Sequence, residues 1–270
     1  MNFWPATLNA AMPQRAHGRL DLAFGHDGAR TRLARFYQEG CLKARLPRGA
    51  GMEAVALNIS GGIAGGDRLD VALDLAPGAE ALFTTQAAER VYRALEAPAR
   101  LRTKLVAGAG AKLHYLPQET ILFDGFALDR ALEIDLAAGA EFLGVESLVF
   151  GRLAMGEILR AGALRDRICL RREGALLWQD STRLEGDIAA QLDRPGVAAG
   201  ARAVACIFAV GPWRLEDLRA ALEGAHAGAS WVGEVLVARI LAPDAAALRR
   251  VLVRALAVLR PAGLPRVWQG

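Results

Sequence analysis

The sequence has few of the residues that usually hold metals or form covalent cross-links. It contains three cysteines and four histidines in 270 residues, and no two of them have the spacing of a zinc motif. Cys41, Cys169 and Cys206 stand far apart and are odd in number, which argues against a disulfide framework. We therefore predict that the cysteines are small core hydrophobes.

Long apolar runs and concentrated charge are also missing. No run approaches the roughly 18 apolar residues that span a bilayer, and the N-terminal segment lacks the basic and apolar regions of a signal peptide. Lysine is scarce, at three residues against 30 arginines, and the arginines are dispersed along the chain. Dispersed charge is not typical of a nucleic-acid-binding surface. These absences predict a soluble cytoplasmic protein with no nucleic-acid or membrane partner.

Standard catalytic motifs are absent as well. The chain has neither the GxSxG elbow of a serine nucleophile nor the HExxH helix of a zinc protease, and its histidines are isolated. Carboxylates do gather between residues 67 and 157. Two suitably spaced carboxyls would be enough for a β-helix enzyme acting on saccharides, so this enzyme stands as the alternative interpretation.

The segment NISGGIAGGDR (58–68) is dense in glycine, but its spacing excludes the familiar nucleotide-binding loops. Gly61, Gly62, Gly65 and Gly66 form two adjacent pairs, whereas a dinucleotide fingerprint separates its glycines. A P-loop continues with lysine and a hydroxyl residue, but Asp67 follows here and would repel phosphate. We interpret the glycine pairs as a turn that lets backbone pass closely between β layers.

The dipeptide Gly-Ala recurs along the chain and marks a repeat. It stands at residues 49–50, 78–79, 110–111, 139–140 and 174–175. Four copies follow a run that alternates in polarity, as a strand buried on one face does. Strand–turn–strand units repeated at about 30 residues bury their apolar faces by stacking. We predict a mainly β fold, a β-helix-like stack of such units, with an irregular sandwich of hairpins as the alternative.

From about residue 201 the pattern changes to strand, helix, strand and helix. Residues 201–211 and 230–242 are predicted as strands, and residues 212–225 and 243–260 as helices. We therefore divide the chain into a β-rich stacked body (1–200) and an α/β C-terminal segment (201–270) that packs on it as one structural unit.

Polar residues recur at one register of the repeat. Gln86, Gln118, Ser147 and Thr182 each stand seven residues after a Gly-Ala alanine, so stacking would place them in a column, with Glu146 beside Ser147. Such a column must satisfy its own hydrogen bonds, line water or lie at an exposed edge.

Two segments hold more charge than packing requires. In TTQAAERVYR (84–93), a helical turn that starts at Thr84 or Thr85 is predicted to carry four residues along one side: Gln86, Glu89, Arg90 and Arg93. ESLVFGRLAMGE (146–157) combines two glycines with an arginine and two glutamates. A buried network of arginines and carboxylates that fixes loops would explain both segments equally well.

Taken together and in this order, these segments resemble the family of the urease accessory protein UreD, called UreH in some organisms. The resemblance rests on 58–68, 84–93, LPQETILFDGFALDR (116–130), 146–157 and LPRVW (264–268), and it spans nearly the whole chain. The residues that carry it are Ser60, Gly61, Gly62, Gly65, Gly66, Thr84, Thr85, Gln86, Tyr92, Arg93, Gly151, Arg152 and Gly156.

The resemblance implies a urease maturation factor and not an enzyme. UreD-like proteins bind apo-urease and UreF, which recruits the GTPase UreG, and the assembly inserts nickel into the urease active site. The chain itself would then hold no cofactor stably, nickel would at most pass through it, and UreG would use the GTP. A dimer within the accessory complex is compatible with this role.

A metal passage toward urease has been proposed for the family. We expect Asp67, Glu89, Glu146 and Glu157 to line such a route. Oxygen ligands suit this task because they hold a divalent ion weakly enough to release it.

Overall fold

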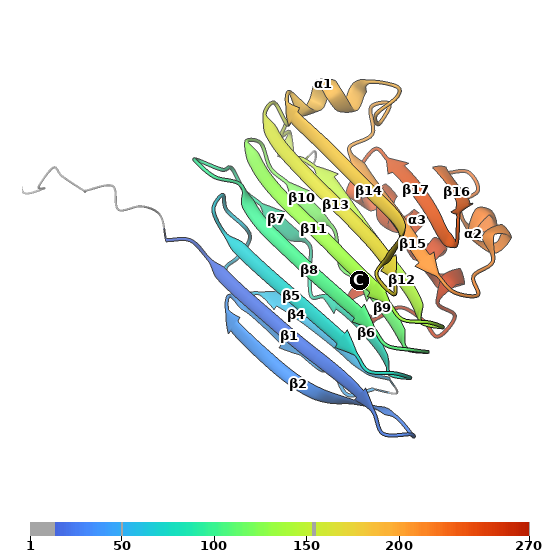
Figure 1. Cartoon of the computed structure of the whole chain (residues 1–270). Helices are drawn as coiled ribbons and strands as arrows, with labels where there is room; N and C mark the ends of the chain where they lie inside the picture. The colour runs from blue at the N-terminus through green and yellow to red at the C-terminus, as the bar shows by residue number, and fades with distance from the viewer. Residues whose placement is uncertain (1–13, 50, 153–154, 270) are drawn as a thin grey trace, which may run out of the picture.

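The computed structural model describes residues 14–49, 51–152 and 155–269. The chain winds into a coil whose two long sheets face each other, and helices lie beside the last strands (Figure 1). The mainly β, β-helix-like prediction is thus confirmed.

The elements have the following bounds. The first sheet contains β1 (His17–His26), β2 (Thr31–Gly40), β5 (Arg68–Leu75), β8 (Ala99–Ala107), β11 (Phe126–Leu136), β13 (Gly162–Arg172) and β14 (Ala175–Gly186). The second contains β3 (Leu42–Arg45), β4 (Glu53–Asn58), β6 (Glu80–Thr85), β9 (Lys112–Leu116), β12 (Glu141–Phe150), β15 (Ala203–Val210), β16 (His226–Val232) and β17 (Val235–Ala242), and the short strands β7 (Glu89–Val91) and β10 (Thr120–Leu122) join its side. The helices are α1 (Ile188–Asp193), α2 (Leu215–Ala221), α3 (Ala245–Leu259) and the 3-10 turn η2 (Arg266–Trp268).

The Gly-Ala repeat forms the corners of the coil. β5, β8, β11 and β13 pair in parallel in the first sheet, as β4, β6, β9 and β12 do in the second. The chain crosses between the sheets at Gly78, Gly110 and Gly139, where φ is +72°, +64° and +69°. Glycine adopts this left-handed conformation without steric cost. The corners stack, since Gly78 N donates to Ala109 O at 2.9 Å.

The other two Gly-Ala positions are not corners of the coil. Gly174 lies in the hairpin between β13 and β14, which pair antiparallel within the first sheet. Gly49 lies between β3 and β4, which also pair antiparallel, and Ala50 lies outside the described residues. A hairpin returns the chain within its own sheet, so these two copies flank the coil.

The helical turn predicted for residues 84–93 is wrong. β6 runs to Thr85, a bend follows, and β7 pairs in parallel with β10. Ile63 also forms a bridge with Val91. Backbone hydrogen bonds to neighbouring turns of the coil therefore decide the conformation. Successive side chains of the strand point to opposite sides, so Glu89 is half-buried and Arg90 is exposed, instead of lying on one face of a helix.

The C-terminal segment continues the second sheet. β15 pairs antiparallel with β12, and β17 with β15. The single strand predicted for 230–242 is corrected to two, β16 and β17, because the chain reverses at Gly233, where φ is +57°. α2 and α3 cover the outer face of this part of the sheet with buried leucines, and β12 is consequently buried on both faces. Within the described ranges, no helix is long and apolar enough to cross a membrane.

The interior of the coil is apolar except at one level. Inward side chains such as Leu73, Leu105 and Ile134 are almost fully buried. Arg130, Glu146 and Asp166 interrupt this core. Of the cysteines, which are free thiols, Cys206 is buried and the other two are partly buried.

We expect alanine substitutions to separate two kinds of glycine. Gly110→Ala should lower the free energy of unfolding by about 1–2 kcal/mol, the cost of a non-glycine residue in the left-handed backbone conformation. No steric clash adds to this cost, because the added Cβ meets nothing within 4 Å. Gly62→Ala should cost more, because its Cβ would lie 2.3 Å from Tyr92 Cε2. Gly228→Ala, in open space on β16, is the control and should be neutral. Urea unfolding followed by circular dichroism measures all three, and equal losses at Gly62 and Gly110 would contradict the close approach.

Candidate functional site

A cavity of about 230 Å³ lies between the two sheets, on the side opposite the Gly-Ala corners. We call it the loop-side cavity, because residues 58–62, 86–90 and 117–120 form much of its wall. Its polar lining includes Glu89, Gln118, Thr120, Arg130 and Glu146. The exposed residues Gly61, Gln86 and Arg90 also line it, so it reaches the surface there.

A second cavity of about 330 Å³ lies farther along the coil. We call it the seam cavity, because β13 and β14 form one wall and β15 and β17 the other. Asp166, Asp180, Thr182, Cys206 and Arg239 line it, and burial raises the pKa of the Cys206 thiol to about 12. Exposed Val197 and Arg239 bring this cavity to the surface at a different place.

Arg130 and Glu146 line both cavities, and a buried charged cluster stands where the cavities meet. Arg130 Nη1 donates to Glu146 Oε2 at 2.5 Å, and Arg130 Nε and Nη2 donate to the two oxygens of Asp166 at 2.9 and 2.6 Å. Tyr115 Oη donates to Glu146 Oε1 at 3.2 Å, and Arg130 Nη1 also reaches Thr120 Oγ1 at 3.3 Å. Arg130 and Glu146 thus form part of the wall of both cavities.

Burial controls the protonation of this region. Desolvation raises the pKa of Glu146, although the Arg130 charge opposes the shift. Desolvation also raises the pKa of Glu89 to about 7, against a hydrogen bond from Asn58 Nδ2 at 3.2 Å. For Arg130, burial would lower the pKa, and the charges of Asp166 and Glu146 outweigh burial and raise it. Glu89 can therefore exchange a proton near neutral pH.

The structure brings together only two of the four predicted route residues. Glu89 and Glu146 line the loop-side cavity. Asp67 instead ties loops together, since its two oxygens accept from Ala16 N and Ala64 N at 2.8 Å each. Glu157 accepts from the Arg152 side chain and backbone, which makes a loop-fixing ion pair of the kind that the sequence offered as an alternative.

The glycine pairs let loop 58–66 pass close to its neighbour, as interpreted from the sequence. At Gly62 φ is +142° and at Gly65 an added Cβ would meet Ala97 O at 2.6 Å. Ser60 Oγ donates to Gly62 O at 2.8 Å, and Tyr92 Oη donates to Gly61 O at 3.1 Å. The other motif glycines, Gly66, Gly151 and Gly156, have φ of +88°, +82° and +71°.

The remaining motif residues hold successive turns of the coil together. Thr84 Oγ1 donates to Leu116 O at 2.6 Å, and Thr85 Oγ1 accepts from Gln118 N at 2.9 Å. Arg93 Nη2 donates to Asp124 Oδ2 at 2.8 Å. Four motif residues, Gly61, Gly62, Thr85 and Gln86, line the loop-side cavity, and the others fix the loops and strands around it.

The polar column forms only in part. Gln86 and Gln118 line the loop-side cavity, and Thr182 lines the seam cavity. Ser147 lies on the opposite face of β12 from Glu146, so Glu146 takes the inward place.

The C-terminal tail fixes Gln118 at the cavity wall. Arg249 stacks on the Trp268 ring at 4.5 Å and donates to Gln118 Oε1, while Trp268 Nε1 donates to Leu116 O at 3.0 Å. Gln118 Nε2 is buried without a protein partner. The bond from Arg249 sets the orientation of the amide, and this leaves a free donor at the cavity wall.

Sequence reasoning missed Arg130 and Asp166, although a signal was present. Both occupy inward positions of alternating strands, with Leu128 and Leu132 flanking Arg130, and Leu164 and Ile168 flanking Asp166. A charged residue at an apolar register indicates a buried partner.

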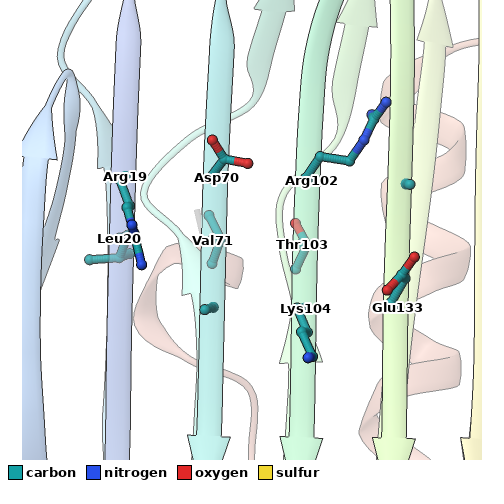
Figure 2. A pocket seen from close by; sticks show the side chains of 10 residues that line it. Arg19, Leu20, Asp70, Val71, Arg102, Thr103, Lys104 and Glu133 are labelled. Carbon is teal, nitrogen blue, oxygen red and sulfur yellow. The ribbon is translucent and has the colours of Figure 1, made fainter.

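The outer face of the first sheet holds a groove of about 360 Å³ that is less suited to a site. Figure 2 shows Arg19 on β1, Asp70 on β5, Arg102 and Lys104 on β8, and Glu133 on β11. Arg102 reaches toward β11 and donates to Asp129 at 2.8 Å, and Glu133 is in register with Lys104. This mixed, solvated surface provides control positions.

The geometry defines a class of protein: a parallel β-coil with two internal cavities that share the side chains of Arg130 and Glu146. Among the described residues, no three metal-binding side chains gather into one cluster. The family model described as UreD urease accessory protein matches residues 16–269. A urease accessory protein UreD of Chelativorans sp. (strain BNC1) is 47% identical over 264 residues, covering 94% of each chain.

Other relatives agree with this match. A urease accessory protein UreD of Xanthobacter autotrophicus is also 47% identical over 264 residues, covering 96% of this chain and 91% of the relative. One of Rhizobium rhizogenes is 44% identical over 262 residues, covering 95% and 96%. The chain therefore belongs to the UreD family of urease accessory proteins, which implies a role in urease maturation.

We expect Arg130→Met to destabilise the fold by about 3–5 kcal/mol, because it leaves Glu146 and Asp166 buried without their cation. Adding Glu146→Gln and Asp166→Asn to Arg130→Met should restore much of this loss. Urea unfolding of the single and triple variants is the measurement. A triple variant as unstable as the single one would show that packing, and not charge, makes Arg130 necessary.

We expect Glu89→Gln to change the pH dependence of stability. The folded pKa of about 7 lies above the ordinary value of 4.5, so the folded state binds the proton more tightly, and this stability is lost as pH rises from about 4.5 to 7. The stability of Glu89→Gln relative to the parent should therefore be higher above pH 7 than at pH 4, by about 1.4 kcal/mol for each unit by which folding raises the pKa of Glu89. His114, whose pKa burial lowers to about 4, acts in the opposite direction and cancels in this difference. A difference independent of pH between 4 and 8 would contradict the shift.

Proposed function

We propose that this chain helps to load nickel into urease by binding apo-urease and UreF, and UreG through UreF. In this proposal UreG supplies GTP hydrolysis, the chain performs no catalysis of its own, and the complex acts in the cytoplasm. Membership of the urease accessory family supports this role. The relatives' names favour it over the carboxylate-dependent saccharide enzyme.

The observation that carries the proposal is the pair of cavities that meet at Arg130 and Glu146. They reach the surface at two separate places, so together they offer a route through the coil. Nickel would be cargo on this route and not a resident cofactor.

The chemistry of the lining suits brief handling of a divalent ion. Glu89 accepts a hydrogen bond from the Asn58 amide and lines the cavity, so it is a half-buried carboxylate with spare capacity to bind a cation. A Glu89 carboxyl that titrates near pH 7 lets metal compete with a proton and leave again. An ion that crosses to the seam cavity displaces the ion pairs of Arg130, so a salt-bridge rearrangement accompanies each passage.

We expect Glu89→Gln and Glu146→Gln to lower nickel-dependent urease activation several-fold in a reconstitution with apo-urease, UreF, UreG, GTP and bicarbonate. The matched control is Glu133→Gln on the outer sheet face, which should activate normally. Binding of each variant to UreF is measured beside activation, so that lost assembly is separated from lost passage. Normal activation by both cavity variants would reject the route.

We expect Asp67→Ala and Glu157→Ala to behave differently from the cavity variants. Each removes acceptors of backbone N–H groups, so the main effect should be a lower melting temperature. Activation at a temperature where the variants remain folded should be close to normal. Loss of urease activation with an unchanged melting temperature would show that Asp67 and Glu157 take part in the proposed route after all.

A further inference from the structure

The side of the coil opposite the Gly-Ala corners carries exposed apolar side chains. We call this side the loop edge and define it as residues 59–67, 86–98, 117–125, 151–152 and 155–161. The four most exposed large hydrophobic residues of the described chain all lie on it: Met155 (76% exposed), Leu95 (71%), Ile59 (62%) and Ile158 (59%). Apolar side chains gathered at one edge mark an interaction surface, whereas scattered ones do not.

An open groove of about 520 Å³ crosses the loop edge. Its lining includes the Tyr92 and Phe123 rings, which pack edge to face with centroids 5.0 Å apart, and exposed Ile158. The Arg152 guanidinium covers the Phe123 ring at 4.3 Å. The groove thus combines aromatic and aliphatic side chains, which can contact an apolar side chain, with the charged side chains of Arg93, Asp124, Glu157 and Arg160.

The carboxylates and the arginines of the loop edge differ in exposure. Asp124 accepts from Arg160 N, Ala161 N and Arg93, and these bonds hold its pKa below the ordinary value. Partial burial alone would raise the pKa of Glu157, but hydrogen bonds from the Arg152 side chain and from backbone N–H groups outweigh burial and lower this pKa as well. Asp124 and Glu157 are therefore paired within the edge, and their partners Arg93 and Arg152 are more exposed than the carboxylates are.

Arg90 and Arg160 add free positive charge. Both are exposed, and neither forms an ion pair with a carboxylate of the described chain. Arg90 lies at the mouth of the loop-side cavity and Arg160 lines the groove. Glu96 is the exposed carboxylate of the edge. An acidic surface complements this distribution.

Backbone hydrogen bonds make the edge rigid. Phe123 N donates to Val91 O at 3.0 Å, Gly125 N to Ala161 O at 2.8 Å and Gly151 N to Leu122 O at 2.8 Å. A surface fixed in this way loses little conformational freedom when it binds.

We propose that the loop edge docks an acidic segment of a partner protein, whose apolar side chain enters the groove beside Tyr92, Phe123 and Ile158. A second copy of this chain does not fit through the same surface, because Arg90, Arg93 and Arg160 of two loop edges would face each other. The inference rests on the proposed function, since the partner would be one of the proteins with which the chain assembles. Docking here places that partner over the mouth of the loop-side cavity.

The test measures binding of the full-length chain to purified UreF and, separately, to urease apoprotein, by biolayer interferometry at low and high salt. Arg160→Glu and Ile158→Ser should each weaken binding to one of these partners by about tenfold or more, and salt should weaken the parent complex. Arg160→Lys should bind nearly as the parent does.

Matched controls lie away from the loop edge. Arg167→Glu changes an exposed arginine on the outer face of β13, and Leu176→Ser changes a residue that is 57% exposed near the opposite side. Both should bind within about twofold of the parent. Circular dichroism and melting confirm folding, and Arg90→Glu replaces any loop-edge variant that fails to fold.

The outcomes separate the two proposals. Loop-edge variants that bind both partners as tightly as the parent would overturn the docking surface and leave the maturation role standing. Self-association of the parent that Arg160→Glu abolishes would assign the edge to a second copy and overturn the inference. A parent that binds neither partner and does not raise urease activation would overturn the proposed function itself.

Discussion

Parallel pairing between successive turns of the coil places residues about one repeat apart side by side. Tyr115 and Glu146, 31 residues apart, share a hydrogen bond, and Arg130 and Asp166, 36 residues apart, form an ion pair. Both sheets depend on this register, since a slip of one residue would turn every inward side chain outward. The positive φ at Gly78, Gly110 and Gly139 maintains the register by keeping each crossing equally short.

Within that frame, the buried cluster is the least tolerant part of the interior. Arg130 stands among leucines and is stable there because both carboxylates and Thr120 satisfy its donors. The same residues line two cavities, so the interior does not close into a uniform apolar core. The close packing of the interior is interrupted at the level of the cluster, and the proposed route for a metal ion runs through this level.

The strands and corners could be predicted from the sequence where neighbouring residues alone determine the backbone conformation. Gly-Ala with alternating flanks identified three corners of the coil, but the same dipeptide at Gly174 and Gly49 lies in hairpins, because the next strand pairs within its own sheet. Residues 84–93 suggested a helical turn from their spacing, yet β7 forms because β10 offers it hydrogen-bond partners. Among the acidic candidates, Glu89 and Glu146 face the cavity, whereas Asp67 and Glu157 bind loop backbone.

The sequence by itself determined the class of fold, the repeat and the family, because these depend on alternation, on glycine at tight turns and on motifs that are contiguous in the chain. It did not determine which charges meet. Arg130, Glu146 and Asp166 come from three different strands. The exposed residues that line the loop-side cavity lie in the first half of the chain, and those that line the seam cavity lie in the second half. Only the winding of the coil brings them together, since register between strands is a property of the whole assembly of hydrogen bonds and not of any one segment.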